Sequence, residues 1–221
     1  MTNTEKGLYA IGLVLLVVGH YLGLFWVEPE RMMGEVGRIL YVHVPAAWLS
    51  LVCYVVAFVG ALGHLLAGSK KMDHTAEAAT EVGVVLNALL LVLGSLFARP
   101  TWGVWWTWDP RLTASAVMWL SFVGVILLRG AVHDPERRAS WGNVATVLAF
   151  INIPITYFSV QMWRSIHQVQ SSPETVASTM VLVLRLNAFA FLFLAFGFMV
   201  TRARIAALRA AAESPPAPVN P

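Results

Sequence analysis

Residues 82–98 read VGVVLNALLLVLGSLFA, an apolar run without a charged side chain. A helix needs roughly 20 predominantly apolar residues to cross the hydrocarbon core of a bilayer. Strands of a membrane barrel would instead show short segments of alternating polarity. Five further apolar runs extend the pattern along the chain: 7–27, 39–67, 112–129, 141–162 and 176–201. The sequence therefore predicts an all-α, polytopic integral membrane protein with six transmembrane helices.

The composition supports the same fold class. Hydrophobic residues make up 58% of the 221 residues and charged residues 12%, whereas about 25% is usual for soluble domains. The first run, 7–27, is too long for the apolar core of a signal peptide and precedes Glu28-Pro29-Glu30 rather than small residues, so we expect a retained helix. We divide the chain into a six-helix membrane domain, 1–205, and an Ala- and Pro-rich tail, 206–221, expected to be disordered.

Positive charges between the expected helices are distributed unevenly. Lys and Arg concentrate in loops on the cytoplasmic side of a membrane. Nine occupy one alternate set of loops and ends: Lys6, Lys70, Lys71, Arg129, Arg137, Arg138, Arg202, Arg204 and Arg209. Five occupy the other set: Arg31, Arg38, Arg99, Arg111 and Arg164. We therefore expect a multi-pass inner-membrane protein, with both termini cytoplasmic and the first, third and fifth loops on the outer face.

The third loop is unusually rich in tryptophan. Residues 100–113, PTWGVWWTWDPRLT, contain four of the nine tryptophans. An aromatic belt at the headgroup level is one explanation, but a belt does not require this density. If the segment is helical, residues three and four apart share a face, and the indoles form a flat shelf for a large planar ligand. The side chains on that expected face are Trp102, Trp105, Trp106 and Asp109.

Two histidines are expected on the same side as this loop. His43 lies at the outer end of the second expected helix, and His167 follows the fifth. A single histidine at a membrane edge is usually a hydrogen-bonded structural residue. Two that flank an aromatic segment favour ligation of haem iron, because neutral imidazole is a common ligand of it. Arginines that could bind the haem propionates are Arg99, Arg111 and Arg164.

Other polar and breaker residues are given structural interpretations. Cys53 is expected to be a buried apolar residue, and His20 is a spare candidate ligand. We expect Arg185 to extend from the last helix to the interface, although intramembrane charges are often functional. Pro45 suits the first turn of a helix, Pro100 a loop, and Pro154 a kink in the fifth helix. The sequence contains no nucleotide-binding loop and no hydrolytic set of side chains, so no enzyme activity is expected.

The tryptophan segment resembles the "WWD" motif of the haem-handling proteins of cytochrome c maturation. The matching residues are Trp102-Gly103-x-Trp105-Trp106-x-Trp108-Asp109-x-Arg111-Leu112-Thr113. Within that superfamily, the length and the six expected helices most resemble the haem exporter protein C (CcmC) family. The stretch 41–48, YVHVPAAW, is similar to the family's first histidine motif. The longer WWD-motif relatives, CcmF and the system II proteins, do not fit this length.

This resemblance implies a function and a set of site residues. The WWD segment, including Trp108 and Gly103, would lie on the periplasmic side of the bacterial inner (cytoplasmic) membrane. It would bind haem b without a covalent bond, with His43 and His167 as axial ligands. The haem would be presented to the chaperone CcmE. CcmA, CcmB and CcmD would be the other subunits of an ABC-type transporter complex, with ATP hydrolysis in CcmA.

Two alternatives belong to different functional classes. A b-type cytochrome for electron transfer would ligate haem inside the hydrocarbon, whereas both favoured histidines are expected at its edge. A solute permease would place polar groups near the middle of the bilayer, where this sequence has few.

Overall fold

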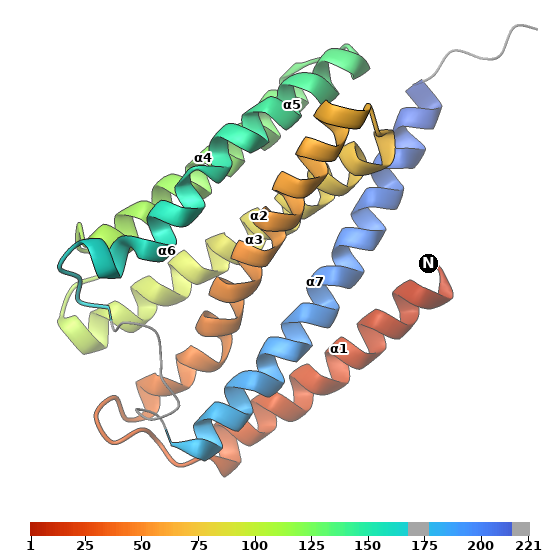
Figure 1. The fold of residues 1–221 in the computed structure, drawn as a ribbon. Helices are drawn as coiled ribbons and strands as arrows, with labels where there is room; N and C mark the ends of the chain where they lie inside the picture. The colour runs from red at the N-terminus through yellow and green to blue at the C-terminus, as the bar shows by residue number, and fades with distance from the viewer. Residues whose placement is uncertain (168–176, 214–221) are drawn as a thin grey trace, which may run out of the picture.

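The computed structural model describes residues 1–167 and 177–213, and within these ranges the chain forms helices and no strand. Figure 1 shows the helices as a single bundle. The α-helices are α1 (Asn3–Tyr21), α2 (Leu40–Ala67), α3 (Lys70–Trp102), α4 (Pro110–Ala131), α5 (Pro135–Phe150), α6 (Asn152–Met162) and α7 (Ser178–Glu213). A π-helical turn, Leu22–Trp26, extends α1, and a 3-10 helix, Glu35–Ile39, leads into α2.

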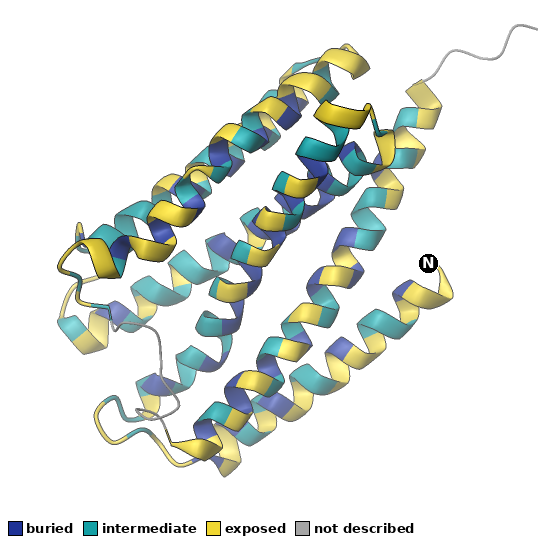
Figure 2. Ribbon diagram, viewed as in Figure 1, coloured by how far each residue is buried: buried dark blue, intermediate teal, exposed yellow. Residues whose placement is uncertain are grey.

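Six of the resulting spans are long and apolar enough to cross a membrane, because α5 and α6 together form one of them. The prediction of a polytopic all-α membrane protein is confirmed. Many large apolar side chains face outward in the middle of the helices, for example Val17, which is 67% exposed, and Leu120, which is 59% exposed. Figure 2 shows exposed residues along the whole length of α1, as expected for a helix whose outer face meets lipid.

The helices pack in three groups. In the bundle α2 and α3 pack closely together, with α1 and α7 on one side and α4, α5 and α6 on the other (Figure 1). Small buried residues, such as Ala57 and Ala79, let α2 and α3 approach closely, as in other membrane helix pairs. Between α2 and α4, the rings of Tyr54 and Phe122 stack at 3.7 Å. This packing fixes the relative heights of the helix ends, and thereby the loops.

Three prolines behave differently. The predicted kink at Pro154 is confirmed: α5 ends at Phe150, whose carbonyl would have accepted from the N–H that Pro154 lacks, and α6 begins two residues later. The other two predictions are wrong. Pro45 lies inside α2, beyond its first turn, and α3 continues through Pro100 to Trp102. Pro45 is buried in the bundle, whereas Pro100 is exposed near the end of α3.

The last helix is longer than expected. α7 continues past the apolar run and through residues 206–213, which we had assigned to the tail. The remaining residues of that tail, 214–221, lie outside the described part of the chain.

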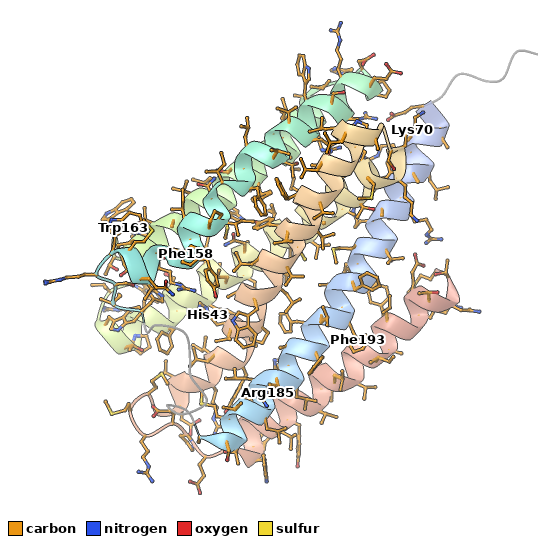
Figure 3. All side chains as sticks on the ribbon, viewed as in Figure 1. His43, Lys70, Phe158, Trp163, Arg185 and Phe193 are labelled. Carbon is orange, nitrogen blue, oxygen red and sulfur yellow. The ribbon has the colours of Figure 1, made fainter. Side chains whose placement is uncertain are left out.

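The bundle has two chemically distinct ends, which we name for the rest of the article. The lysine end carries Lys70, the chain start, the 131–135 connection and the end of α7; the tryptophan end carries residues 27–39, 103–109 and 163–167. Figure 3 shows Lys70 at one end of the bundle, and His43, Trp163 and Arg185 toward the other.

Candidate functional site

The segment between α3 and α4 is not a helix. Gly103, with φ +80°, ends α3 in the left-handed conformation that glycine adopts readily, and its N–H bonds to the Arg99 carbonyl at 3.0 Å. At the other end, Pro110 disfavours helical geometry at Asp109, which is extended. The predicted helical face of Trp102, Trp105, Trp106 and Asp109 is therefore wrong.

The segment instead folds back onto α3. The Ser95 hydroxyl, two turns before the end of α3, donates to the Trp105 carbonyl at 2.7 Å. The guanidinium of Arg99 donates to the Gly103 carbonyl. Arg99, a predicted propionate partner, thus helps to close the end of α3.

The four indoles of this segment differ in their surroundings. Trp108 is 83% exposed and Trp105 55%, whereas Trp102 and Trp106 are half-buried. Trp106 and Trp108 meet edge to face at 6.1 Å and 85°, so they do not form one flat surface. Trp102 lies between the rings of Phe97, at 5.8 Å, and His167, at 5.6 Å. One indole therefore contacts a predicted iron ligand, and two others project outward.

His43 lies in the first turn of α2 and packs against α3. A Cβ atom at Gly94 of α3 would come within 3.1 Å of the His43 Cε1 atom, so this glycine makes room for the ring. The Nδ1 atom of His43 is buried and has no hydrogen-bond partner within residues 1–167 and 177–213. The ring also lies beside the backbone of Leu90, one turn before Gly94, so the α3 backbone holds it on one side.

Asp109 is the most connected side chain at the tryptophan end. It is 8% exposed and is the N-cap of α4, and its Oδ1 atom accepts from the N–H of Arg111 at 2.9 Å. The same atom accepts from the Ser165 hydroxyl at 3.1 Å, and Oδ2 accepts from the Ile166 N–H at 2.9 Å. This carboxylate therefore joins the start of α4 to the segment that follows α6.

His167 lies beside that carboxylate. Its Nδ1 atom faces the Asp109 Oδ1 atom at 3.3 Å, without the alignment of a hydrogen bond. Burial lowers the pKa of His167, Asp109 raises it and Arg111 lowers it, and the result is below the ordinary value. Burial raises the pKa of Asp109, but hydrogen bonds from Ile166, Ser165 and Arg111 more than offset it, so that pKa is also lowered. Near neutral pH the site thus holds a carboxylate beside a neutral imidazole.

The remaining predicted residues are placed as follows. Arg111 lies half-buried in the first turn of α4, and Arg164 is exposed just after α6. Arg185 is exposed on α7 toward the tryptophan end (Figure 3). His20 bonds to the Leu16 carbonyl of its own helix at 2.9 Å, and Cys53 is fully buried.

Three residues that contact the site were not predicted from the sequence. Ser95, Gly94 and Ser165 act through contacts between segments, and nothing in the local pattern distinguishes them. The only hint for Ser165 is its place two residues before His167, whose N–H bonds to the Ser165 hydroxyl at 3.0 Å.

Comparison with known proteins decides the family. The family model described as Heme exporter protein C matches residues 2–216. The chain belongs to the Heme exporter protein C family. The match covers every helix described above, as well as the tryptophan-rich segment and both histidines.

Relatives of this family come from distant organisms. A Heme exporter protein C of Bradyrhizobium diazoefficiens is 37% identical over 74% of this chain and 62% of its own length. The Heme exporter protein C of Escherichia coli K12 is 34% identical over 86% of this chain and 78% of its own. A putative cytochrome c biosynthesis ccmC-like mitochondrial protein of Marchantia polymorpha is 31% identical over 86% and 82%. The chain thus spans less than two thirds of the first relative and about four fifths of the others.

The side chains of the tryptophan end suit iron held in a porphyrin. In the described residues, no three His, Cys, Asp or Glu side chains are grouped to hold a bare metal ion. A porphyrin supplies four nitrogen ligands itself and needs only one or two from the protein. Haem also has an apolar face and anionic propionates, and the same end offers exposed indoles and the arginines Arg99, Arg111 and Arg164.

Proposed function

We propose that this chain handles haem for cytochrome c maturation: it binds haem b non-covalently at the periplasmic surface of the bacterial inner membrane and presents it to the chaperone CcmE. In this proposal haem is the molecule that the chain transfers, not a permanently bound cofactor. Membership of the Heme exporter protein C family supports the general role. The contact between Trp102 and His167, at 5.6 Å, carries the assignment of the site.

His43 and His167 are the proposed axial ligands. The described helices place both at the tryptophan end, one in the first turn of α2 and the other just past α6. The neutral state of His167 suits an imidazole that ligates iron. The position of both rings near a helix end, rather than in the middle of the bundle, favours a transfer site over an electron-transfer cytochrome.

The exposed indoles are proposed to hold the open side of the haem. Trp105 and Trp108 project from the segment that is anchored to α3 through Ser95. Aromatic rings contribute contact area against a planar ligand at little entropic cost. Arg99, Arg111 and Arg164 are the proposed partners of the propionates, because a guanidinium forms paired hydrogen bonds to a carboxylate. An anchored but exposed segment can release one haem edge to a partner.

The assembly and orientation complete the proposal. Lys70 and Lys71 lie at the lysine end, which we place in the cytoplasm together with both termini. CcmA, CcmB and CcmD are the proposed partners, and ATP hydrolysis in CcmA drives release of loaded CcmE. The chain itself is proposed to have no catalytic turnover.

The experiment is an absorption spectrum of the detergent-purified chain after expression with haem supply. The wild type should show a low-spin haem b spectrum, and His43→Ala and His167→Ala should each lose most of the haem and the transfer to CcmE. His20→Ala is the matched control, because its ring bonds within α1, and it should retain haem fully. Wild-type spectra and transfer in both alanine variants would refute the ligand assignment.

A further inference from the structure

We infer that Asp109 is a positioning residue, whose carboxylate fastens the tryptophan-rich segment to the segment that carries His167 and orients the His167 ring so that its Nε2 atom is free for iron. This inference rests on the proposed function. It concerns how the ligand is held rather than which ligand is used.

The first support is the number and origin of the donors around one carboxylate. Two come from the first turn of α4, the N–H groups of Arg111 and Leu112, at 2.9 and 3.4 Å. Two come from the segment after α6, the Ser165 hydroxyl and the Ile166 N–H, at 3.1 and 2.9 Å. The chain between these groups spans α4, α5 and α6, so no local turn accounts for the contact. Asp109 therefore ties two segments that are far apart in sequence.

The second support is the position of the histidine. His167 directly follows Ile166, and its Nδ1 atom lies 3.3 Å from Asp109 Oδ1. A carboxylate beside Nδ1 favours the tautomer with the proton on Nδ1 and the lone pair on Nε2, which is the arrangement seen when a histidine ligates a metal. Catalytic and ligand contacts that are poorly aligned without ligand commonly tighten when it binds. Asp109 would thus set both the place of the ring and its tautomer.

The hydrogen-bond donors around residue 109 require two acceptor oxygens, which a carboxylate has and an amide lacks. Oδ1 faces the Arg111 N–H and Oδ2 faces the Ile166 N–H. An asparagine has one acceptor oxygen and one NH₂ group, which can only donate. In either orientation, an amide at this position places its NH₂ against a backbone N–H and loses one of the two attachments. Asp109→Asn is therefore a sharp test despite its nearly identical size.

The chain contains a matched control for this test. Asp134 also precedes a proline and caps a helix, α5, but it is exposed. Among the described residues, the one donor to its side chain is the Arg137 N–H, at 2.8 Å. One acceptor oxygen satisfies that cap, so Asp134→Asn should change nothing. Asp109→Ser is a second test variant. Serine is a good helix N-cap, but its side chain is too short to reach Ile166 and His167. It separates capping of α4 from positioning of the histidine.

The experiment has one readout without haem and one with it. In the full-length protein without haem, ¹⁵N spectra of labelled histidines, assigned with His167→Ala, report the His167 tautomer; after loading, haem retention and the reduction potential are measured. Wild type and Asp134→Asn should have the proton on Nδ1. Asp109→Asn and Asp109→Ser should lose that preference, retain haem on the order of 10-fold less well and show a shifted potential.

The outcomes separate this inference from the proposed function. Unchanged tautomer and haem retention in both Asp109 variants would overturn the positioning role. If His43→Ala and His167→Ala also bind haem like the wild type, the ligand assignment in the proposed function fails, but the spectra without haem still decide whether Asp109 sets the tautomer. If the wild type itself binds no haem, the proposed function fails as a whole. Loss of folding in Asp109→Asn alone would leave Asp109→Ser to decide.

Discussion

The two ends of the bundle are held together by different kinds of contact. At the lysine end, charged side chains pair with one another: the buried Arg129 bonds to Asp73 at 2.8 Å and to Asn143 at 3.1 Å. At the tryptophan end, the side chains of Asp109 and Ser95 bond largely to backbone groups and to a hydroxyl. The first end is closed by a network between helices. The second fixes its backbone and leaves indoles and ring nitrogens available, which is the arrangement a site for a large ligand needs.

The two Asp-Pro helix starts repeat this contrast on a smaller scale. Asp134 begins α5 at the lysine end and is exposed, with one backbone donor. Asp109 begins α4 at the tryptophan end and is buried, with four donors from two segments. Both residues stand in an Asp-Pro pair at a helix start. They differ in their surroundings, because residues 165 and 166, after α6, pack against Asp109. A cap can therefore be a local feature at one end and part of a site at the other.

The largest expected effect is the loss of the network at the lysine end. Arg129→Ala leaves Asp73 and Asn143 buried without their cation, and breaking a buried ion pair from one side costs about 3–5 kcal/mol. We expect this loss in the free energy of unfolding, measured by titration with a denaturing detergent. Haem retention per folded molecule should stay unchanged, since His43 and His167 lie at the other end.

The control for Arg129 is Arg137, which is exposed and contributes only its backbone N–H to the cap of α5. Arg137→Ala should alter the unfolding free energy by less than about 0.5 kcal/mol. Equal stability of the two variants would show that ion pairs do not stabilise the lysine end. The two ends would then not differ in the kind of contact that holds them.

A smaller effect is expected at the contact between α3 and the His43 ring. In Gly94→Ala the added Cβ lies 3.1 Å from Cε1 of His43, so the ring must move by a few tenths of an ångström. We expect haem retention to fall severalfold while the helices stay intact, measured as Soret absorbance per protein. Gly124→Ala in α4 is the matched control, because a Cβ there meets no atom within 4 Å. Equal retention in the two variants would show that His43 is not held by α3.

Much of this architecture could be predicted from hydropathy, because long apolar runs have few alternatives in a bilayer. The placement of His43, the tryptophan segment and His167 at one end followed from the alternation of the loops. The helical shelf was wrong because the left-handed Gly103 and Pro110 interrupt the helix on both sides of the segment. The tie between Asp109 and Ile166 could not be predicted, since it depends on how α4 and α6 end relative to each other.

The smallest expected effect on stability concerns the exposed indole of Trp108. It is 83% exposed and contacts Trp106 only edge to face, so Trp108→Ala should change the unfolding free energy by less than about 0.5 kcal/mol. Trp102 is half-buried between Phe97 and His167, and Trp102→Ala should lower both stability and haem retention. Transfer of haem to CcmE, followed as formation of the loaded chaperone, should fall in both variants. Trp108→Ala with wild-type transfer would mean that the outward-facing indole anchors the loop at the membrane surface and takes no part in presenting the haem.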